Sequence, residues 1–487
     1  MTAILPPVRR TGLVAVVAAV AVVAVGVRFA VLLAADGLLG SSAYDDGVYF
    51  AAGAALAHGR WPYADVLLLH PPGIVLALAP FGALGALVGD PAAVVVARLV
   101  WIGIGGAGCA LVAVLAGRRS IPAGLVAGAG AACLHPLAFG ERSTLIEPLG
   151  TLLLLVALLV GDRGGRRAAV IAGAVAGLSL DLKIWYVVPV LVLLLLARHR
   201  LRFLLGAVVA AAVVALPFLL RAPDAMVRQV VLDQLGRPTE DDTLLGRVAA
   251  ITGASWFGDG LAGERAFVPS MLVLAVVVVA AALAWRTPIG RRAVLLLAGT
   301  AAVLLASPSF FAHYVAYTGP WLALVLGVAA GEALGPLRSR SLVVGGTVAL
   351  AAAVVVPTLR FDLLPPKRTP SIAAVAIAAQ RVDGCIRSDD PGLLAAMGVL
   401  SSQLARGCAL RPDVTGYSFD RPGLPARAAD RAGSERWQRF VTGYLLGGDA
   451  VIVARDGTGL SAESRRRIAA LPVLARSGPL VLHAVPR

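Results

Sequence analysis

The chain has 487 residues, of which 59% are hydrophobic and only 15% are charged, and its formal net charge is +15. Its mean hydropathy is +0.85, and so few polar side chains could not cover the surface of an ordinary soluble protein. The composition therefore predicts a polytopic α-helical membrane protein, because barrel strands would alternate polar and apolar residues. We attribute the basic balance to membrane topology and expect no nucleic-acid partner.

Long apolar runs follow one another along the chain and predict membrane-spanning helices. The first run, 12–35, follows a short basic segment and is interpreted as a retained helix rather than a cleaved signal. The run 72–88 is flanked by prolines and glycines, so we expect it to lie at the outer surface or to dip in and return. The eleven predicted spans are 12–35, 92–116, 121–137, 145–160, 168–181, 186–197, 203–220, 266–285, 293–306, 315–330 and 341–357.

The boundaries between these runs alternate between basic and acidic, which is typical of a chain that crosses a membrane repeatedly. The basic boundaries, predicted to be cytoplasmic, hold Arg9, Arg10, Arg118, Arg119, Arg163, Arg166, Arg167, the segment 198–202, Arg286, Arg291, Arg292, Arg338 and Arg340. The acidic boundaries, predicted to be extracytoplasmic, hold Asp36, Asp45, Asp46, Asp65, Asp90, Glu141, Glu147, Asp181, Asp224, Asp233, Glu240, Asp241, Asp242, Asp259 and Glu264. Only Asp162 and Glu332 break this segregation. We therefore expect a plasma-membrane protein with a cytoplasmic N-terminus.

The composition changes after Pro357, where a linker at 365–368 leads into a segment that carries charge throughout. We predict a membrane domain over 1–360, with a first outer loop at 36–91, and a small extracytoplasmic α/β domain over 361–487. Its expected elements are a helix at 371–382, a strand at 450–455, a helix at 462–471 and a strand at 480–485. Cys385 and Cys408 fall in this domain, where an oxidising compartment would allow either a disulfide or two free thiols.

Two adjacent carboxylates, Asp45 and Asp46, follow the first apolar run. Ionised carboxylates at a membrane boundary need water or a cation beside them, so the pair is a functional-site hypothesis. The alternative is an ordinary solvated loop after a helix.

Other polar residues of the membrane half also fall on the acidic side, and each has a structural alternative. Arg28 and Arg98 could snorkel to the lipid headgroups. Asp181 and Lys183 could form a structural ion pair, and His313 could belong to an interfacial aromatic belt. The whole set is Arg28, His70, Arg98, His135, Glu141, Arg142, Asp181, Lys183, His313 and Tyr314.

Chemistry on the extracytoplasmic side would need a donor that is delivered in the membrane, such as a sugar on a polyprenyl phosphate, because nucleotide sugars are scarce there. Glycosyl transfer from such a donor needs a base for the acceptor hydroxyl and cations or hydrogen-bond donors for the departing phosphate. Asp45 or Asp46 could supply the base. The candidates for binding the donor phosphate are Lys183, Arg142, His313 and Tyr314.

The first outer loop resembles that of the GT-C superfamily of polyprenyl-phosphate-dependent glycosyltransferases, which includes protein O-mannosyltransferases, the lipid A aminoarabinose transferase and actinobacterial mannosyl- and arabinosyltransferases. The resemblance rests on the segments Asp45-Asp46-Gly47-Val48-Tyr49, Gly59-Arg60-Trp61-Pro62-Tyr63-Ala64-Asp65 and Pro71-Pro72-Gly73. Weaker matches are Lys183 in an apolar stretch and Phe311-Ala312-His313-Tyr314. The segment 413–421 is similar to the soluble tails of some members.

This resemblance implies a GT-C-like membrane domain in which Asp45 is the catalytic base and the anomeric centre is inverted without a covalent intermediate. The family usually has Asp-Glu at this position and this chain has Asp-Asp, so the division of labour between the carboxylates stays open. The expected substrate-binding residues of the loop are Tyr49, Tyr63, Asp65 and His70. Some members bind a divalent metal with this loop, although the sequence has no second acidic cluster that would require one.

The leading hypothesis is therefore an inverting glycosyltransferase that moves a mannose- or arabinose-like sugar from a polyprenyl phosphate to an envelope glycan, glycolipid or protein. A transporter or flippase of a lipid-linked substrate is the alternative, with the acidic pair as an ion site. Transporters commonly have repeated halves and polar residues near the bilayer midplane, whereas here the charges cluster on one side. A third alternative is a non-catalytic assembly protein.

Overall fold

The computed structural model describes residues 7–35, 37–40, 44–238, 243–254, 267–337, 339–362 and 371–486, so the predicted linker at 365–368 lies outside the described residues. The chain forms two compact units, each discontinuous in sequence. The helical unit comprises Met1–Ala34, Leu99–Val213 and Asp241–Pro366, and the α/β unit comprises Ala35–Arg98, Val214–Glu240 and Lys367–Arg487. The divisions at 98/99 and 213/214 fall inside helices α4 and α10.

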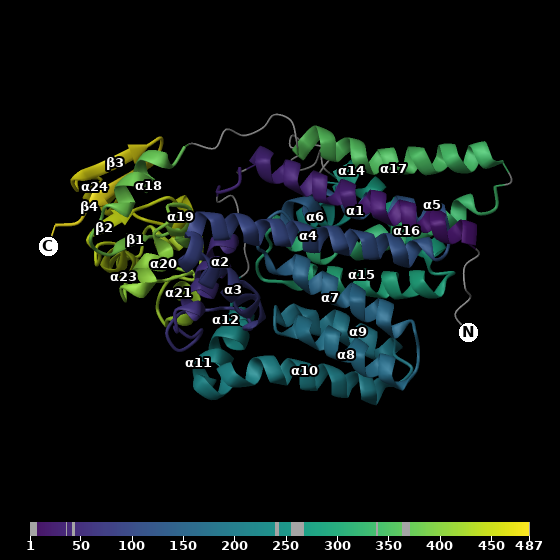
Figure 1. The fold of residues 1–487 in the computed structure, drawn as a ribbon, viewed down its shortest axis with the longest axis horizontal. Coiled ribbons are helices and arrows are strands. Elements are labelled where there is room, and N and C mark those ends of the chain that lie inside the picture. Colours follow the sequence, from purple (N-terminus) through teal and green to yellow (C-terminus); the bar gives the residue numbers. More distant parts are fainter. Residues whose placement is uncertain are drawn as a thin grey trace. The chain divides into compact units, whose positions relative to one another are not determined.

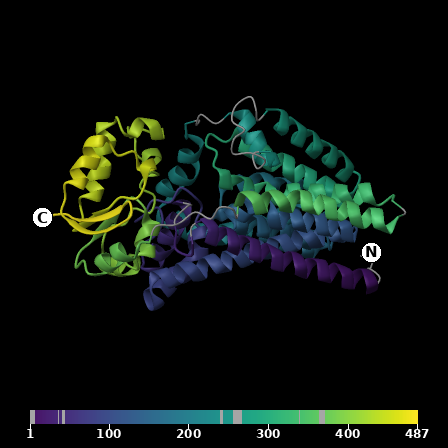
Figure 2. The ribbon, with the colours of Figure 1, turned by 90° about the horizontal axis from the view of Figure 1, so that it is seen from above.

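Long helices run alongside one another in the helical unit, as Figures 1 and 2 show from two directions. Within the unit α5 contacts α16 and α17, α7 contacts α8, and α15 contacts α9 and α16. The helices are α1 (Pro7–Ala35), α4 (Asp90–Gly117), α5 (Ile121–Cys133), α6 (His135–Gly140), α7 (Ile146–Gly161), α8 (Arg166–Leu180), α9 (Val187–Leu196), α10 (Arg200–Arg221), α13 (Leu244–Thr252), α14 (Phe267–Ala284), α15 (Pro288–Ala306), α16 (Gly319–Leu334) and α17 (Arg340–Asp362), with 3-10 turns at Ile184–Tyr186 and Ala312–Tyr317.

Each of the eleven predicted spans coincides with one of these helices, with ends that differ by a few residues. Among the described residues, five helices are long and apolar enough to cross a membrane, and six apolar helices are shorter. These helices confirm a polytopic helical membrane protein, and the count of eleven crossings stays a prediction. The long ones are Thr11–Ala34, Asp90–Gly117, Arg200–Arg221, Phe267–Ala284 and Pro288–Ala306.

Small residues let helices approach closely in the helical unit. A Cβ atom added to Gly173 or Gly177 of α8 would overlap the backbone of Phe203 or Ala207 of α10. Close contact of this kind is a main source of helix association in membranes, where lipid is as apolar as the side chains.

Two helices from the first outer loop pack together in the α/β unit: α2 (Tyr44–Ala57) and α3 (Gly73–Val88). The predicted run 72–88 is thus a helix, and whether it crosses the membrane stays a prediction. The other short helices are α11 (Pro223–Val227), α12 (Asp233–Leu235), α18 (Ala373–Gln380), α19 (Pro391–Ala396), α20 (Leu400–Ala405), α21 (Tyr417–Asp420), α22 (Ala428–Arg431), α23 (Glu435–Leu445) and α24 (Ala462–Ala469), with a π-turn at Arg228–Leu232 and a 3-10 turn at Asp456–Thr458.

A four-stranded sheet, in the order β1-β2-β4-β3, lies within the described part of the C-terminal segment. Its strands are β1 (Ile386–Ser388), β2 (Ala450–Ile452), β3 (Val473–Ser477) and β4 (Leu480–Ala484). β1 and β2 are parallel and the other neighbours are antiparallel. The predicted helices and strands correspond to α18, β2, α24 and β4. β1 and β3 were not expected, because β1 has three residues and β3 has an irregular, mostly exposed pattern.

A compact apolar core supports this sheet, with Val414, Trp437, Val441 and Val451 all fully buried. Cys385 and Cys408 are joined by a disulfide, which decides between the two states that the sequence left open. The main chain at Cys408 also accepts a hydrogen bond of 2.6 Å from Arg60, which follows α2. The C-terminal segment and the outer loop are therefore linked within one unit.

Candidate active site

The acidic pair Asp45–Asp46 lies in the first turn of α2. Carboxylates are favourable there because the helix dipole places partial positive charge at the N-terminus. Asp46 is 4% exposed, and Asp45 is half-buried. The interpretation of the pair as an ordinary solvated loop is therefore wrong for Asp46.

Arg98 of α4 holds Asp46 in place. Its Nε lies 3.0 Å from Asp46 Oδ2, and an Nη atom contacts the same oxygen. The guanidinium also donates to the carbonyls of Leu38 at 2.7 Å and Gly40 at 2.6 Å. Arg98 is 5% exposed, so the alternative that it snorkels to headgroups is wrong. Its contacts fix both the entry to α2 and the second carboxylate of the pair.

The C-terminal segment packs directly on the first turn of α2. The hydroxyl of Tyr44 lies 3.1 Å from both Asp413 Oδ1 and the Val414 amide, and the Arg455 guanidinium lies 3.1 Å from the centre of the Tyr44 ring. A Cβ atom added to Gly47 would lie 2.6 Å from the backbone of Gly392. Glycine is therefore needed next to the acidic pair, because only glycine permits this approach.

The predicted substrate-binding residues of the outer loop lie partly together. The rings of Tyr49 and His70 meet edge to face with centroids 5.6 Å apart, and the Tyr63 hydroxyl donates to the His70 carbonyl at 2.7 Å. Tyr63 has a φ of 70°, a rare conformation for a residue other than glycine. Asp65 is exposed and accepts a 2.8 Å hydrogen bond from the Trp61 amide. These contacts shape the segment 61–70.

In the helical unit, Lys183 lies in a buried site made by a carboxylate and two aromatic rings. Its Nζ is 3.0 Å from Glu147 Oε1, and it lies 3.7 Å and 4.1 Å from the ring centres of Tyr314 and Trp185. Lys183 and Glu147 are 4% and 3% exposed. The cluster brings together the start of α7, the turn that follows α8, and the turn at 312–317. We call these four residues the Lys183 cluster.

The sequence left two structural alternatives open here, an ion pair of Lys183 with Asp181 and an aromatic belt that includes His313. The proposed pair of Asp181 with Lys183 is wrong, since within the described residues the ion pair of Lys183 is with Glu147. The ring of His313 stacks on Phe311 at 5.9 Å and meets Tyr314 at 4.7 Å. His313 therefore borders the Lys183 cluster, and its membership of an aromatic belt stays an interpretation.

Arg28 and Arg142 are both fully buried. The Arg28 Nε lies 2.7 Å from Glu141 Oε2, and its Nη atoms donate to the carbonyls of Ala24, Ala131 and Ala132. The alternative that Arg28 snorkels is therefore wrong, because the side chain links helices inside the unit. The Arg142 guanidinium lies 3.6 Å from the centre of the Phe139 ring and donates to the Phe139 carbonyl.

The structure assigns partners that the sequence did not identify: Glu147 for Lys183, Glu141 for Arg28, and Arg98 for Asp46. One signal was present, because Glu147 falls inside the predicted span 145–160, where a carboxylate requires a cation. Among the described residues, no three His, Cys, Asp or Glu side chains gather in a way that could hold a metal ion.

Known proteins resemble this chain in a sequence family and in fold. The model for glycosyltransferase family 87 matches residues 68–308. The structure of ArnT from Cupriavidus metallidurans in the apo state is similar, with a TM-score of 0.61, 16% identity and coverage of 98% of both chains. The same values hold for the structure of ArnT from that organism bound to undecaprenyl phosphate. No curated protein sequence matches the chain.

The match of residues 68–308 to a glycosyltransferase family favours glycosyl transfer over the transporter and assembly-protein alternatives, and the fold is similar to that of ArnT.

Proposed function

We propose that the chain transfers a mannose- or arabinose-like sugar from a polyprenyl-phosphate donor to an acceptor of the cell envelope, which is a glycan, glycolipid or protein. The observation that carries this proposal is the likeness in fold, over 98% of both chains, to a structure bound to undecaprenyl phosphate. The Lys183 cluster supports it, because a buried cation is what a lipid-linked phosphate requires.

The proposed reaction is a single displacement at the anomeric carbon. The acceptor oxygen forms a bond to this carbon while the bond from carbon to the phosphate oxygen breaks, and the electron pair leaves with the phosphate. Asp45 takes the proton of the acceptor hydroxyl, and the configuration inverts. Asp45 is the better candidate for the base, because Asp46 Oδ2 is already engaged by Arg98. Asp46 then has the role of orienting the first turn of α2.

We assign the donor phosphate to Lys183. Its ammonium would exchange Glu147 for the phosphate, or bind the phosphate while keeping Glu147 on its other side. In a water-excluded site, charge interactions of this kind are stronger than in water. His313, Tyr314 and Arg142 are proposed to support the phosphate and sugar.

We further propose that Tyr49, Tyr63, Asp65 and His70 shape the substrate-binding surface of the outer loop. Charge segregation along the sequence supports an extracytoplasmic location for α2 and the C-terminal segment 361–487, and a cytoplasmic N-terminus. The half-buried contacts between Tyr44 and the C-terminal segment support a role for that segment in holding α2.

The test is transfer of radiolabelled sugar from mannosyl and arabinosyl polyprenyl phosphates by purified protein with envelope acceptors. Asp45→Asn should lower the rate by about 10² to 10⁴, the usual contribution of a general base. Asp430→Asn is the matched control, because Asp430 is an exposed carboxylate of the same unit. Full activity in both Asp45→Asn and Asp46→Asn would refute the assignment of the base, and no transfer from any such donor by the unaltered protein would refute the donor class.

A further inference from the structure

Four arginines line a cavity of about 320 Å³ in the helical unit: Arg118, Arg119, Arg286 and Arg292. They come from the segment after α4, the loop before α15 and the first turns of α15. The cavity is distinct from the Lys183 cluster and shares no residue with it.

The cavity lies where several apolar helices end or begin. α4 ends at Gly117, α7 at Gly161 and α14 at Ala284, and α15 begins at Pro288. α4, α14 and α15 are each long and apolar enough to cross a membrane. Helices of this kind end near the boundary of the hydrocarbon layer, where lipid phosphates lie.

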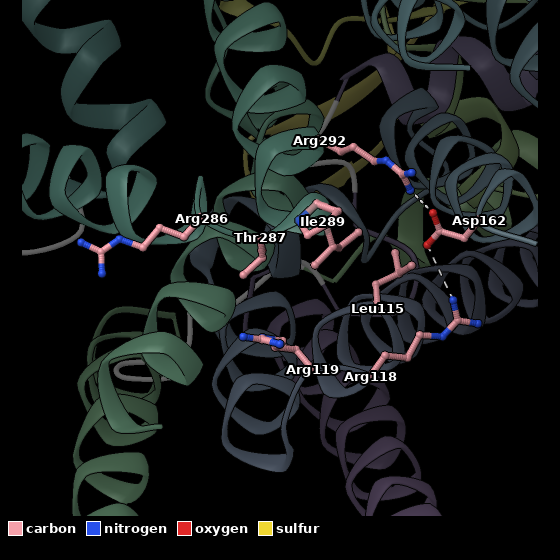
Figure 3. A pocket seen from close by; sticks show the side chains of 9 residues that line it. Leu115, Arg118, Arg119, Asp162, Arg286, Thr287, Ile289 and Arg292 are labelled. Atoms are coloured by element: carbon pink, nitrogen blue, oxygen red, sulfur yellow. Dashed lines mark hydrogen bonds and ion pairs between the residues drawn. The ribbon is translucent and has the colours of Figure 1, made fainter. Parts of the chain in front are cut away.

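Two carboxylates hold the arginines in position. Figure 3 shows Asp162 between two of them: Oδ1 contacts Arg292, and Oδ2 lies 3.6 Å from Arg118 Nη1. Glu332 accepts a 2.9 Å hydrogen bond from Arg119 Nε. Asp162 and Glu332 are the two acids that break the charge segregation along the sequence, so their positions now have a structural reason.

Positive charge remains in excess, because the lining holds four arginines and one carboxylate, Asp162, and Glu332 offsets only Arg119. Arg286 extends away from the ion pairs in Figure 3 and is exposed. Thr287 is buried and its hydroxyl caps α15 by accepting a 3.0 Å hydrogen bond from the Gly290 amide. The positive end of the α15 dipole therefore adds to the potential of the cavity.

We propose that this cavity binds the phosphate of an anionic phospholipid headgroup. The positive-inside rule accounts for the sign of the charge but requires neither a cavity nor carboxylates that brace the arginines. Basic pockets between transmembrane helices are suited to anionic headgroups. Leu115 and Ile289 add an apolar wall, which suits the acyl chains of a phospholipid. This proposal does not depend on which sugar is transferred.

The experiment titrates the purified full chain in neutral detergent with fluorescent phosphatidylglycerol. Unlabelled phosphatidylglycerol, phosphatidylcholine and inorganic phosphate compete in separate arms. Each arginine near a membrane surface contributes about a fivefold increase in affinity, so Arg118→Gln with Arg286→Gln should weaken binding about 25-fold. The matched control is Arg166→Gln with Arg167→Gln, because both are exposed at the start of α8 and lie outside the cavity lining.

Asp162→Asn removes a negative charge from the cavity and should tighten binding of phosphatidylglycerol a few-fold. A misfolded variant would bind more weakly, so tighter binding cannot result from misfolding. Selective loss in the cavity variant, with tighter binding by Asp162→Asn, supports the proposal. Equal loss in the control variant would reduce the effect to general surface charge and overturn it. Equal competition by phosphatidylcholine would also overturn the proposal. Displacement by inorganic phosphate at a similar concentration would overturn the lipid as ligand and show that the cavity binds a soluble anion.

Discussion

Removal of the charges of the Lys183–Glu147 pair, singly and together, separates a structural ion pair from a phosphate-binding lysine. Both side chains are almost fully buried and lie 3.0 Å apart. Removing one partner of a buried pair leaves an uncompensated charge and costs about 3–5 kcal/mol, whereas removing both costs far less. Lys183→Met and Glu147→Gln should therefore each lower the free energy of unfolding by about this amount, and the double variant should recover most of it.

Transfer activity should follow a different pattern from stability. If Lys183 stabilises the departing phosphate, its loss should lower kcat by about 10² to 10³, as for one donor of an oxyanion site. The double variant should then be stable and inactive. Unfolding by SDS titration and transfer from a radiolabelled donor measure the two quantities on the same preparations.

The buried pair Arg28–Glu141 in the same unit supplies the control. Arg28→Met with Glu141→Gln removes a pair of similar burial to which no part of the reaction is assigned. Transfer should persist in this variant at temperatures where it is folded. Wild-type transfer by the Lys183→Met, Glu147→Gln double variant would refute the phosphate-binding role and leave Lys183 as a structural residue.

Three further predictions concern the α/β unit. Asp46→Asn should lower the free energy of unfolding by about 3–5 kcal/mol, because it leaves the Arg98 charge buried and uncompensated. Adding Arg98→Met to this variant should restore the unfolding midpoint. An unchanged midpoint in the single variant would contradict a stabilising Arg98–Asp46 ion pair. Replacing Cys385 and Cys408 by serine opens a loop with a sequence separation of 23 and should lower the free energy of unfolding by about 3 kcal/mol. Equal unfolding curves of the unaltered protein with and without reductant would contradict this prediction. Burial raises the pKa of Asp233 to about 6, above the value of about 3.9 in an unfolded chain, so its contribution to stability is full below about pH 4 and is lost as the pH rises through about 6. Asp233→Asn should make the unfolding midpoint less dependent on pH over this range. An unchanged pH profile of the midpoint would contradict the raised pKa of Asp233.

Most of the fold could be predicted from local sequence patterns. Hydropathy is a local property, so each predicted span coincides with a helix. The strand β1 was missed because its three residues pair with β2, which lies more than 60 residues later in the chain. A strand this short has no pattern of its own and depends on its partner.

The candidate site was only half predictable for a related reason. Asp46 and Lys183 stood out because charge is rare in their surroundings. Their partners, Arg98 and Glu147, are 52 and 36 residues away, and nothing in a single sequence joins such residues. Snorkelling to the headgroups was an alternative for Arg98 because a guanidinium near a span end is usually solvated. Here the turn at 38–40 and Asp46 supply all of its partners that are described.

The contacts between α2 and the C-terminal segment have a consequence for the biogenesis of the enzyme. Tyr44 and Asp413 are 369 residues apart, and the absence of a side chain at Gly47 lets the backbone of Gly392 approach. A growing chain therefore inserts its membrane helices long before the residues that fix the acidic pair have been made. The contacts that fix the first turn of α2 can therefore form only after the C-terminal segment has been synthesised.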